Sequence, residues 1–426
     1  MDMSRIRQPL RVALARDTST FARRWPGKAL VAAVLVGIPV VLFVRSVRGG
    51  SYIDDSWLAV LAAVVVVLAY ALSRRLLATV VVASIVLGAA ALTMTPQLAT
   101  ASTGDDTVLE RLDGLRSDGM LDGYRDLAVA TVDLDAATPI QFAGLGADPH
   151  TRIEIGSLTK AMTGLVIADA VERGEIRLDA PVYTYLPRLN GSPAGAVTMR
   201  ELVTHTAGYV AFGPATMMRG LWAAPLGHNF FSADETQVMA EARAGTLESR
   251  GTYLYSTLGA ATAGLAVAAA TGMDYPELLR TRLFDPLGMS DTVVEEDRNA
   301  VEGGWSASGL PVQPWVMGAY APGGGVVSTA HDLATLATAL LDGTAPGLTA
   351  MDPEAPAGAD DTAVGMFWHI SDWSTGQTIT WHTGQTGGYT TYFGIDRADG
   401  TAVILLSDVS NSAISDLGRE LLADHA

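Results

Sequence analysis

The residues best suited to chemistry lie in the segment 156–160, which reads GSLTK. Residues i and i+3 of a helix share one face, so a helix beginning here would let the Ser157 hydroxyl meet the Lys160 amine. A serine beside an amine is one way to build an activated nucleophile. The spacing therefore predicts a nucleophilic serine with a lysine as its base.

The scarcity of lysine strengthens this interpretation. The chain has two lysines, Lys28 and Lys160, which leaves 28 − 2 = 26 arginines. Arginine keeps its proton near neutral pH, whereas a buried lysine can lose it. A composition that supplies arginine elsewhere indicates a specific need for an amine at Lys160. The alternative is a solvated lysine on the surface of an amphipathic helix.

Strands at both ends of the chain and helices between them must position this pair. A long apolar helix is predicted from Ser157 to Gly174, with more helices up to about Asp342. Strands are predicted at 127–134, 140–145, 362–370, 377–382, 389–395 and 402–407. This order indicates one sheet closed by distant segments, with a helical lobe inserted in the middle.

The charge is divided unevenly along the chain. Residues 1–100 hold 11 basic and 4 acidic residues, so the remainder holds 28 − 11 = 17 basic and 45 − 4 = 41 acidic residues. An acidic domain is a poor nucleic-acid binder, because phosphate contacts need clustered cations. The absence of cysteine excludes disulfides, thiolate metal sites and a cysteine nucleophile.

The N-terminal part predicts a membrane region. Three charge-free apolar runs, about 29–44, 57–72 and 76–94, approach the ~20 residues that cross a bilayer. The basic segment before the first run predicts an N-terminus inside the cell. We therefore expect a multi-pass cell-membrane region over 1–101 and an extracytoplasmic domain over 102–426. Cleavage near Ala101 would instead release the domain.

Several motifs resemble one enzyme family. These are GSLTK at 156–160, LVTHTAG at 202–208, YST at 255–257 and WHTG at 381–384, with a similar stretch at 322–333. Together they resemble the class C β-lactamase family, which also holds D-alanyl-D-alanine carboxypeptidases, D-aminopeptidases and esterases. The resemblance covers about residues 105–420. It implies an α+β, β-lactamase/DD-peptidase-like fold, in which helices flank an antiparallel sheet and a helical lobe is inserted; three transmembrane helices are expected before it.

The resemblance implies roles for three catalytic residues. Ser157 is the nucleophile, and Tyr255 with Lys160 forms a coupled base. Tyr253 is a nearby competitor, but the family match begins at Tyr255. A lysine cation close to a phenol favours the phenolate, so we expect the pKa of Tyr255 to be lowered. The alternative for Tyr255 is an amphipathic core tyrosine.

Two substrate-binding positions depart from the family pattern. Thr257 stands where the family usually has asparagine, and threonine cannot supply an amide donor and acceptor together. We therefore expect weaker recognition of a peptide or acylamino side chain. His382 stands where lysine is usual. Its implied role is to bind the substrate carboxylate, and a histidine would do so weakly and with a dependence on pH.

The residues after His382 complete the implied site. Thr383 and Gly384 let a strand edge approach the ligand. The N–H groups of Gln385 and Ser157 are the implied oxyanion donors. We expect no metal site, since the other histidines lack ligand spacing, and no cofactor. The glycines at 323–325 lack the setting of a phosphate loop and predict a turn.

These observations predict a membrane-anchored, extracytoplasmic serine hydrolase working through an acyl-enzyme on Ser157. Its partners are the lipid bilayer and a small-molecule or peptide substrate: an ester, a D-amino-acid peptide or a β-lactam-like amide. The departures at Thr257 and His382 favour an esterase or peptidase over an efficient β-lactamase. One alternative is a catalytically weak β-lactam or cell-wall-fragment binding protein or sensor. Another is that the apolar runs are themselves the functional part.

Overall fold

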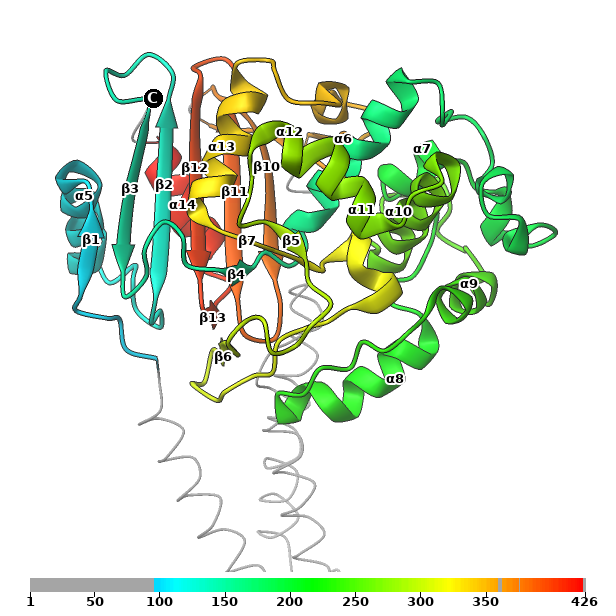
Figure 1. The fold of residues 1–426 in the computed structure, drawn as a ribbon, viewed down its shortest axis with the longest axis horizontal. Coiled ribbons are helices and arrows are strands. Elements are labelled where there is room, and N and C mark those ends of the chain that lie inside the picture. The colour runs from blue at the N-terminus through cyan, green and yellow to red at the C-terminus, as the bar shows by residue number, and fades with distance from the viewer. Residues whose placement is uncertain (1–95, 359–361, 375, 424–426) are drawn as a thin grey trace, which may run out of the picture. The chain divides into compact units, whose positions relative to one another are not determined.

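An eight-stranded antiparallel sheet is the centre of the domain (Figure 1). The computed structural model describes residues 96–358, 362–374 and 376–423, within a compact unit of residues 94–426. The strand order is β1-β3-β2-β12-β11-β10-β9-β8. The bounds are β1 (Ser102–Gly104), β2 (Leu127–Asp133), β3 (Ile140–Leu145), β8 (Ala363–Val364), β9 (His369–Asp372), β10 (Thr378–Gln385), β11 (Thr390–Asp396) and β12 (Thr401–Ser407).

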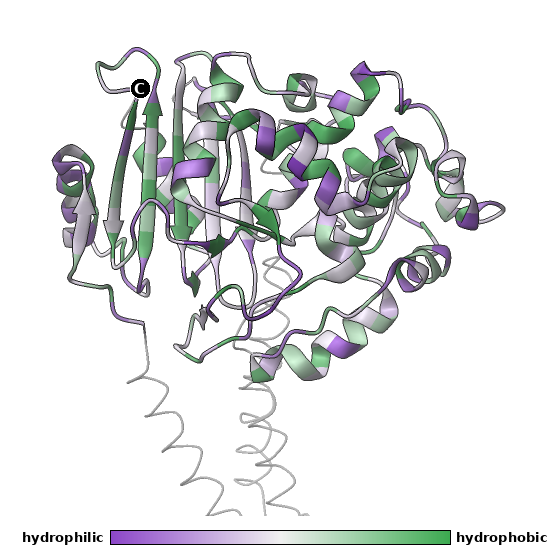
Figure 2. Ribbon diagram, in the orientation of Figure 1, coloured by the Kyte–Doolittle hydropathy of each residue, from purple (hydrophilic) through white to green (hydrophobic). Residues whose placement is uncertain are grey.

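Distant parts of the chain close this sheet, as the sequence predicts. Strand β2 pairs with β12, so Leu127 lies opposite Ser407 and Asp133 opposite Thr401. Both strands are buried along almost their whole length and coloured as hydrophobic over much of it (Figure 2). Helices α5 (Asp106–Ser117) and α14 (Ile414–Ala423) pack on the sheet through a shared apolar core that includes Leu112, Val129 and Leu417.

The inserted lobe is helical and surrounds two apolar helices. Helices α6 (Leu158–Glu172) and α10 (Thr257–Thr271) are buried on nearly every side, which suits their apolar composition. The other α-helices of this lobe are α7 (Met199–Val203), α8 (Pro214–Ala223), α9 (Glu235–Arg243), α11 (Tyr275–Leu279) and α12 (Asp285–Leu287). Helix α13 (Ala330–Leu341) packs on β2 and β12 of the main sheet. A short 3-10 segment, η7 (Gly318–Gly323), packs against both α6 and α10.

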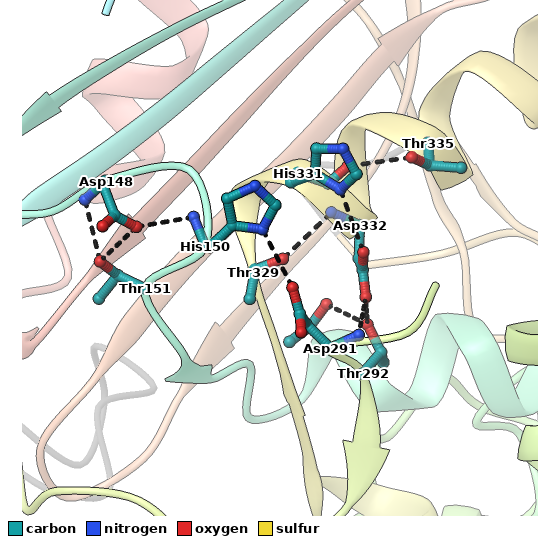
Figure 3. A network of polar contacts seen from close by, with 10 residues as sticks. Asp148, His150, Thr151, Asp291, Thr292, Thr329, His331, Asp332 and Thr335 are labelled. Carbon is teal, nitrogen blue, oxygen red and sulfur yellow. Dashed lines mark hydrogen bonds and ion pairs between the residues drawn. The ribbon is translucent and has the colours of Figure 1, made fainter. Parts of the chain in front are cut away.

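A polar network fastens a second, smaller sheet beside α13 (Figure 3). Strands β4 (Ile153–Glu154), β7 (Val326–Ser328) and β5 (Val293–Val294) form this sheet. The buried Asp332 carboxylate accepts hydrogen bonds from the Asp291 N–H at 2.8 Å and the Thr292 hydroxyl at 2.7 Å. The rings of His150 and His331 stack with centroids 4.7 Å apart. The network joins the segment 148–151, upstream of Ser157, to Asp291 before β5.

One detail of the predicted elements is wrong. The segment 362–370 is not one strand, because Phe367 has a φ of 66° and separates β8 from β9. The local composition did not reveal this interruption of the backbone pairing.

The membrane part of the predicted fold class requires correction. Within the described ranges no helix combines the length and apolarity needed to cross a bilayer. The longest, α6 and α10, have 15 residues each, or about 22 Å, against a hydrocarbon core of ~30 Å. The segments 29–44, 57–72 and 76–94 lie outside the described residues. Three transmembrane helices and a multi-pass membrane location are therefore not supported, and the fold class shown by the described residues is the α+β domain.

Candidate active site

A glycine turn presents Ser157 at the start of α6. Gly156 has a φ of +50°, in the left-handed region that glycine adopts readily. A Cβ on Gly156 would lie 2.7 Å from the Gln385 nitrogen, and one on Gly384 would lie 1.8 Å from the Ile155 carbonyl oxygen. Two glycines thus allow the turn and strand β10 to approach each other backbone to backbone.

Lys160 lies one helical turn after Ser157 and contacts its hydroxyl. The Lys160 Nζ is 2.9 Å from Ser157 Oγ and 2.6 Å from the Gly323 carbonyl oxygen. The lysine side chain is completely buried. Burial lowers the pKa of Lys160 to about 7, because the charged ammonium loses its hydration there. The amine can therefore be neutral near physiological pH and accept the Ser157 proton.

Tyr255 lies beside this pair. The Lys160 Nζ is 4.9 Å from the centroid of the Tyr255 ring, and the phenol forms a hydrogen bond with the Ser157 side chain. The expected lowering of the tyrosine pKa is wrong. Burial raises the pKa of Tyr255 well above its usual range, and the bond to Ser157 only partly opposes this rise. A lowered pKa of Tyr255 would require a positively charged Lys160, and burial disfavours the charged form of that lysine.

The remaining predicted binding residues lie on α10 and β10. Thr257 is the first residue of α10, and its methyl group would be 2.6 Å from a Cβ on Gly323. Thr383 and Gln385 alternate along β10 with the buried His382 and Gly384. The Gln385 side-chain amide donates to Ser410 Oγ at 2.9 Å.

The expectation that His382 carries a pH-dependent positive charge near neutral pH is wrong. Its ring is buried, its Nδ1 lies 2.5 Å from the Thr383 carbonyl oxygen, and its Nε2 has no hydrogen-bond partner among the described residues. Burial lowers the pKa of His382 well below its usual range, and the nearby His369 and Lys160 lower it further. A neutral imidazole cannot bind a carboxylate as a cation near neutral pH.

Three neighbours of this site were not predicted to take part in it. The Gly323 carbonyl belongs to a segment that the sequence indicates only as a turn. His369 lies opposite Trp381 across the β9–β10 pair, with its ring 5.1 Å from that of His382. His205 packs 4.6 Å from the Tyr255 ring. The 202–208 motif marked the location of His205 and the family-like stretch 322–333 that of Gly323, but neither indicated these contacts, and no sequence signal pointed to His369.

This geometry can be compared with known proteins. The family model described as Beta-lactamase matches residues 118–426. The chain belongs to the beta-lactamase family. The resemblance seen in the motifs is thereby confirmed. The family is that of the serine β-lactamases and penicillin-recognising proteins, and the protein is a β-lactamase/DD-peptidase-like hydrolase.

Individual relatives agree with this family. Penicillin-binding protein 4 of Amycolatopsis lactamdurans is 30% identical over 349 residues, covering 74% of this chain and 89% of the relative. A class C beta lactamase from Rhodobacter sphaeroides has a TM-score of 0.61 at 22% identity, covering 73% of this chain and 99% of the other. A D-stereospecific amidohydrolase from Streptomyces sp. has a TM-score of 0.59 at 21% identity, covering 69% and 92%. The two solved structures share the fold of this β-lactamase-family domain.

Proposed function

We propose that this protein hydrolyses its substrate through an acyl-enzyme on Ser157, with Lys160 as the base. The contact that carries the proposal is the 2.9 Å approach of Lys160 Nζ to Ser157 Oγ. A buried amine with a pKa of about 7 has a lone pair available near neutrality. A solvated lysine, with a pKa of about 10.4, would be almost fully protonated there. The burial of Lys160 thus makes the serine a usable nucleophile.

The chemical steps follow from this arrangement. Ser157 Oγ bonds to the substrate carbonyl carbon while its proton passes to Lys160 Nζ. We assign the N–H groups of Ser157 and Gln385 to the oxyanion that forms. The bond from that carbon to the leaving group then breaks, and the leaving oxygen or nitrogen takes a proton from the Tyr255–Lys160 pair. Water attacks the acyl-enzyme next, releasing the acid and restoring the Ser157 hydroxyl.

The same residues bear on the substrate class. A neutral His382 offers no cation to a substrate carboxylate, and Thr257 offers no side-chain amide. Both features weaken the recognition of an acylamino carboxylate such as a β-lactam. We therefore place esters and D-amino-acid peptides ahead of β-lactams as substrates. The similar proteins include a penicillin-binding protein and a D-stereospecific amidohydrolase, so peptides and amides belong in any comparison.

A fluorophosphonate probe tests the nucleophile directly. The full-length protein should gain the mass of one probe, and peptide mapping should place it on Ser157. Ser157→Ala is the matched control and should gain none. An unlabelled parent protein, or equal labelling of the variant, would contradict the proposal. A panel of p-nitrophenyl esters, D-alanyl-D-alanine peptides and benzylpenicillin would then rank the substrates, and turnover of benzylpenicillin ahead of the esters would reverse the order proposed here.

Assays on the parent protein and on Ser157→Ala also distinguish a hydrolase from a binding protein. A hydrolase should turn over a substrate of the panel and lose that turnover in Ser157→Ala. A binding protein should instead gain thermal stability with benzylpenicillin, keep that gain in Ser157→Ala and release no product.

A further inference from the structure

We propose that His205 is a positioning residue that holds Tyr255 against Ser157. The proposal deepens the function above, because it depends on a catalytic role for Tyr255. His205 follows α7 and lies far from Tyr255 in sequence. The two rings nevertheless pack with centroids 4.6 Å apart.

His205 holds the chain on both sides of Tyr255. Its carbonyl oxygen accepts a hydrogen bond from the Leu254 N–H at 2.7 Å. Its ring Nδ1 accepts one from the Ser256 N–H at 3.2 Å. The residues before and after Tyr255 are therefore bound to the same histidine. With the ring contact, the main chain and the side chain of the tyrosine are both fixed by His205.

These contacts also determine the protonation state of the ring. A backbone N–H can only donate, so Nδ1 must be the acceptor and the ring proton lies on Nε2. The ring is almost fully buried, and Nε2 has no hydrogen-bond partner among the described residues. A buried donor without an acceptor costs stability. The His205 ring therefore contributes through its Nδ1 acceptor and its packing faces, and not through Nε2.

Burial, with the groups around the ring, keeps it neutral. Burial lowers the pKa of His205 well below its usual range, and Lys160 and His369 lower it further. The Tyr253, Tyr255 and Phe367 rings pack around it and supply no carboxylate. Protonation of Nδ1 would place two donors against each other at Ser256. A neutral His205 therefore preserves the bond that positions Tyr255.

The backbone at this place is strained. His205 has a φ of 58° and Phe367 has a φ of 66°, a region that side chains larger than glycine rarely adopt. Their ring centroids are 5.1 Å apart, and the Phe367 N–H donates to the Val203 carbonyl oxygen at 2.8 Å. Strain of this kind persists where the surrounding structure requires it, often beside active sites. Here it directs the His205 ring at the segment that carries Tyr255.

Two amide substitutions test this assignment. In His205→Asn the side-chain oxygen can occupy the place of Nδ1 and accept from Ser256, and asparagine tolerates a positive φ. In His205→Gln the amide lies one bond farther out, near the place of Nε2. We expect His205→Asn to keep kcat within about threefold. We expect His205→Gln to lower kcat by about tenfold to a hundredfold at an unchanged KM. This loss is smaller than the full contribution of a proton-transfer group, because the phenol of Tyr255 is misplaced and not removed. His228→Asn, at an exposed histidine, is the control and should match the parent protein.

A third variant guards against a failure to fold. His205→Gly relieves the backbone strain but removes both the acceptor and the ring, so it should lose kcat as His205→Gln does. Normal kcat in either variant, or a loss that appears only in KM, would overturn the assignment. If the fluorophosphonate probe does not label Ser157 of the parent protein, the proposed function is contradicted, and not only the role of His205. The two failures are therefore distinguishable.

Discussion

The carbonyl oxygen of Gly323 lies 2.6 Å from the Nζ of Lys160, although 163 residues separate the two in sequence. A carbonyl can only accept, so one N–H of the amine is directed at Gly323. A neutral amine held in this way can direct its lone pair at Ser157 Oγ, 2.9 Å away. The segment that contains Gly323 therefore orients the amine of Lys160, the proposed base.

The pH dependence of catalysis should follow Lys160. Its pKa of about 7 means that the amine gains its lone pair as the pH rises through neutrality. We expect kcat/KM for a neutral ester to rise about tenfold per pH unit below pH 7 and to level off above it. Lys160→Arg should be low at every pH, because arginine keeps its proton. A midpoint near pH 4–5 in the parent protein would indicate a carboxylate instead.

The same lysine should make stability depend on pH. Its pKa in the folded protein, about 7, is below the ordinary 10.5, so the unfolded chain binds the extra proton between these values. The free energy of unfolding contributed by Lys160 therefore rises with pH over this window. Lys160→Met lacks this term, so its stability advantage over the parent should shrink by roughly 4 kcal/mol from pH 6 to pH 10. Urea unfolding at several pH values measures it, and a constant difference would show that Lys160 titrates normally.

Removing the Tyr255 phenol should affect kcat far more than KM. Tyr255→Phe keeps the ring that packs on His205 but loses the bond to Ser157. We expect kcat to fall by about 10²- to 10⁴-fold, the usual contribution of one proton-transfer group. Tyr253→Phe is the matched control and should remain active. The reverse result would assign the role to Tyr253.

A cation at position 382 should restore carboxylate recognition. The neutral His382 predicts that KM for a carboxylate substrate stays flat between about pH 6 and 8. His382→Lys should raise the preference for that substrate over its methyl ester by about tenfold, or about 1.4 kcal/mol. A parent KM that increases with pH across this range would show that the imidazole is charged after all.

The close approach at Gly384 should not tolerate a side chain. A Cβ there would lie 1.8 Å from the Ile155 carbonyl oxygen and 2.6 Å from Thr391 Oγ1. Gly384→Ala should cost about 3 kcal/mol of unfolding free energy, because backbone would have to move. Gly114→Ala is the control, since a Cβ there meets nothing within 4 Å and alanine favours the helix by up to about 1 kcal/mol. Equal stability of the two variants by chemical denaturation would contradict this.

Much of the fold could be predicted from local signals. The largely apolar stretch at 127–134 predicted β2 (Leu127–Asp133), and the apolar run after Ser157 predicted α6 (Leu158–Glu172). Such runs are predictive because an element buried on nearly every side, as both of these are, must be apolar all round. The signal failed at 362–370, where the positive φ of Phe367 divides the strand. That conformation depends on the contacts of Phe367 and not on its residue type.

The sequence by itself determined which residues could react: the serine and lysine three apart, the family motifs, and the order of strands and helices. Spacing along one helix is enough to bring Ser157 and Lys160 together, so that contact was predictable. Only the tertiary structure decided their protonation states. Burial lowers the pKa of Lys160 and His382 and raises that of Tyr255, whereas the sequence predicted a phenolate beside a cation. A pKa depends on hydration and on neighbours from every part of the chain, and these exist only once the chain has folded.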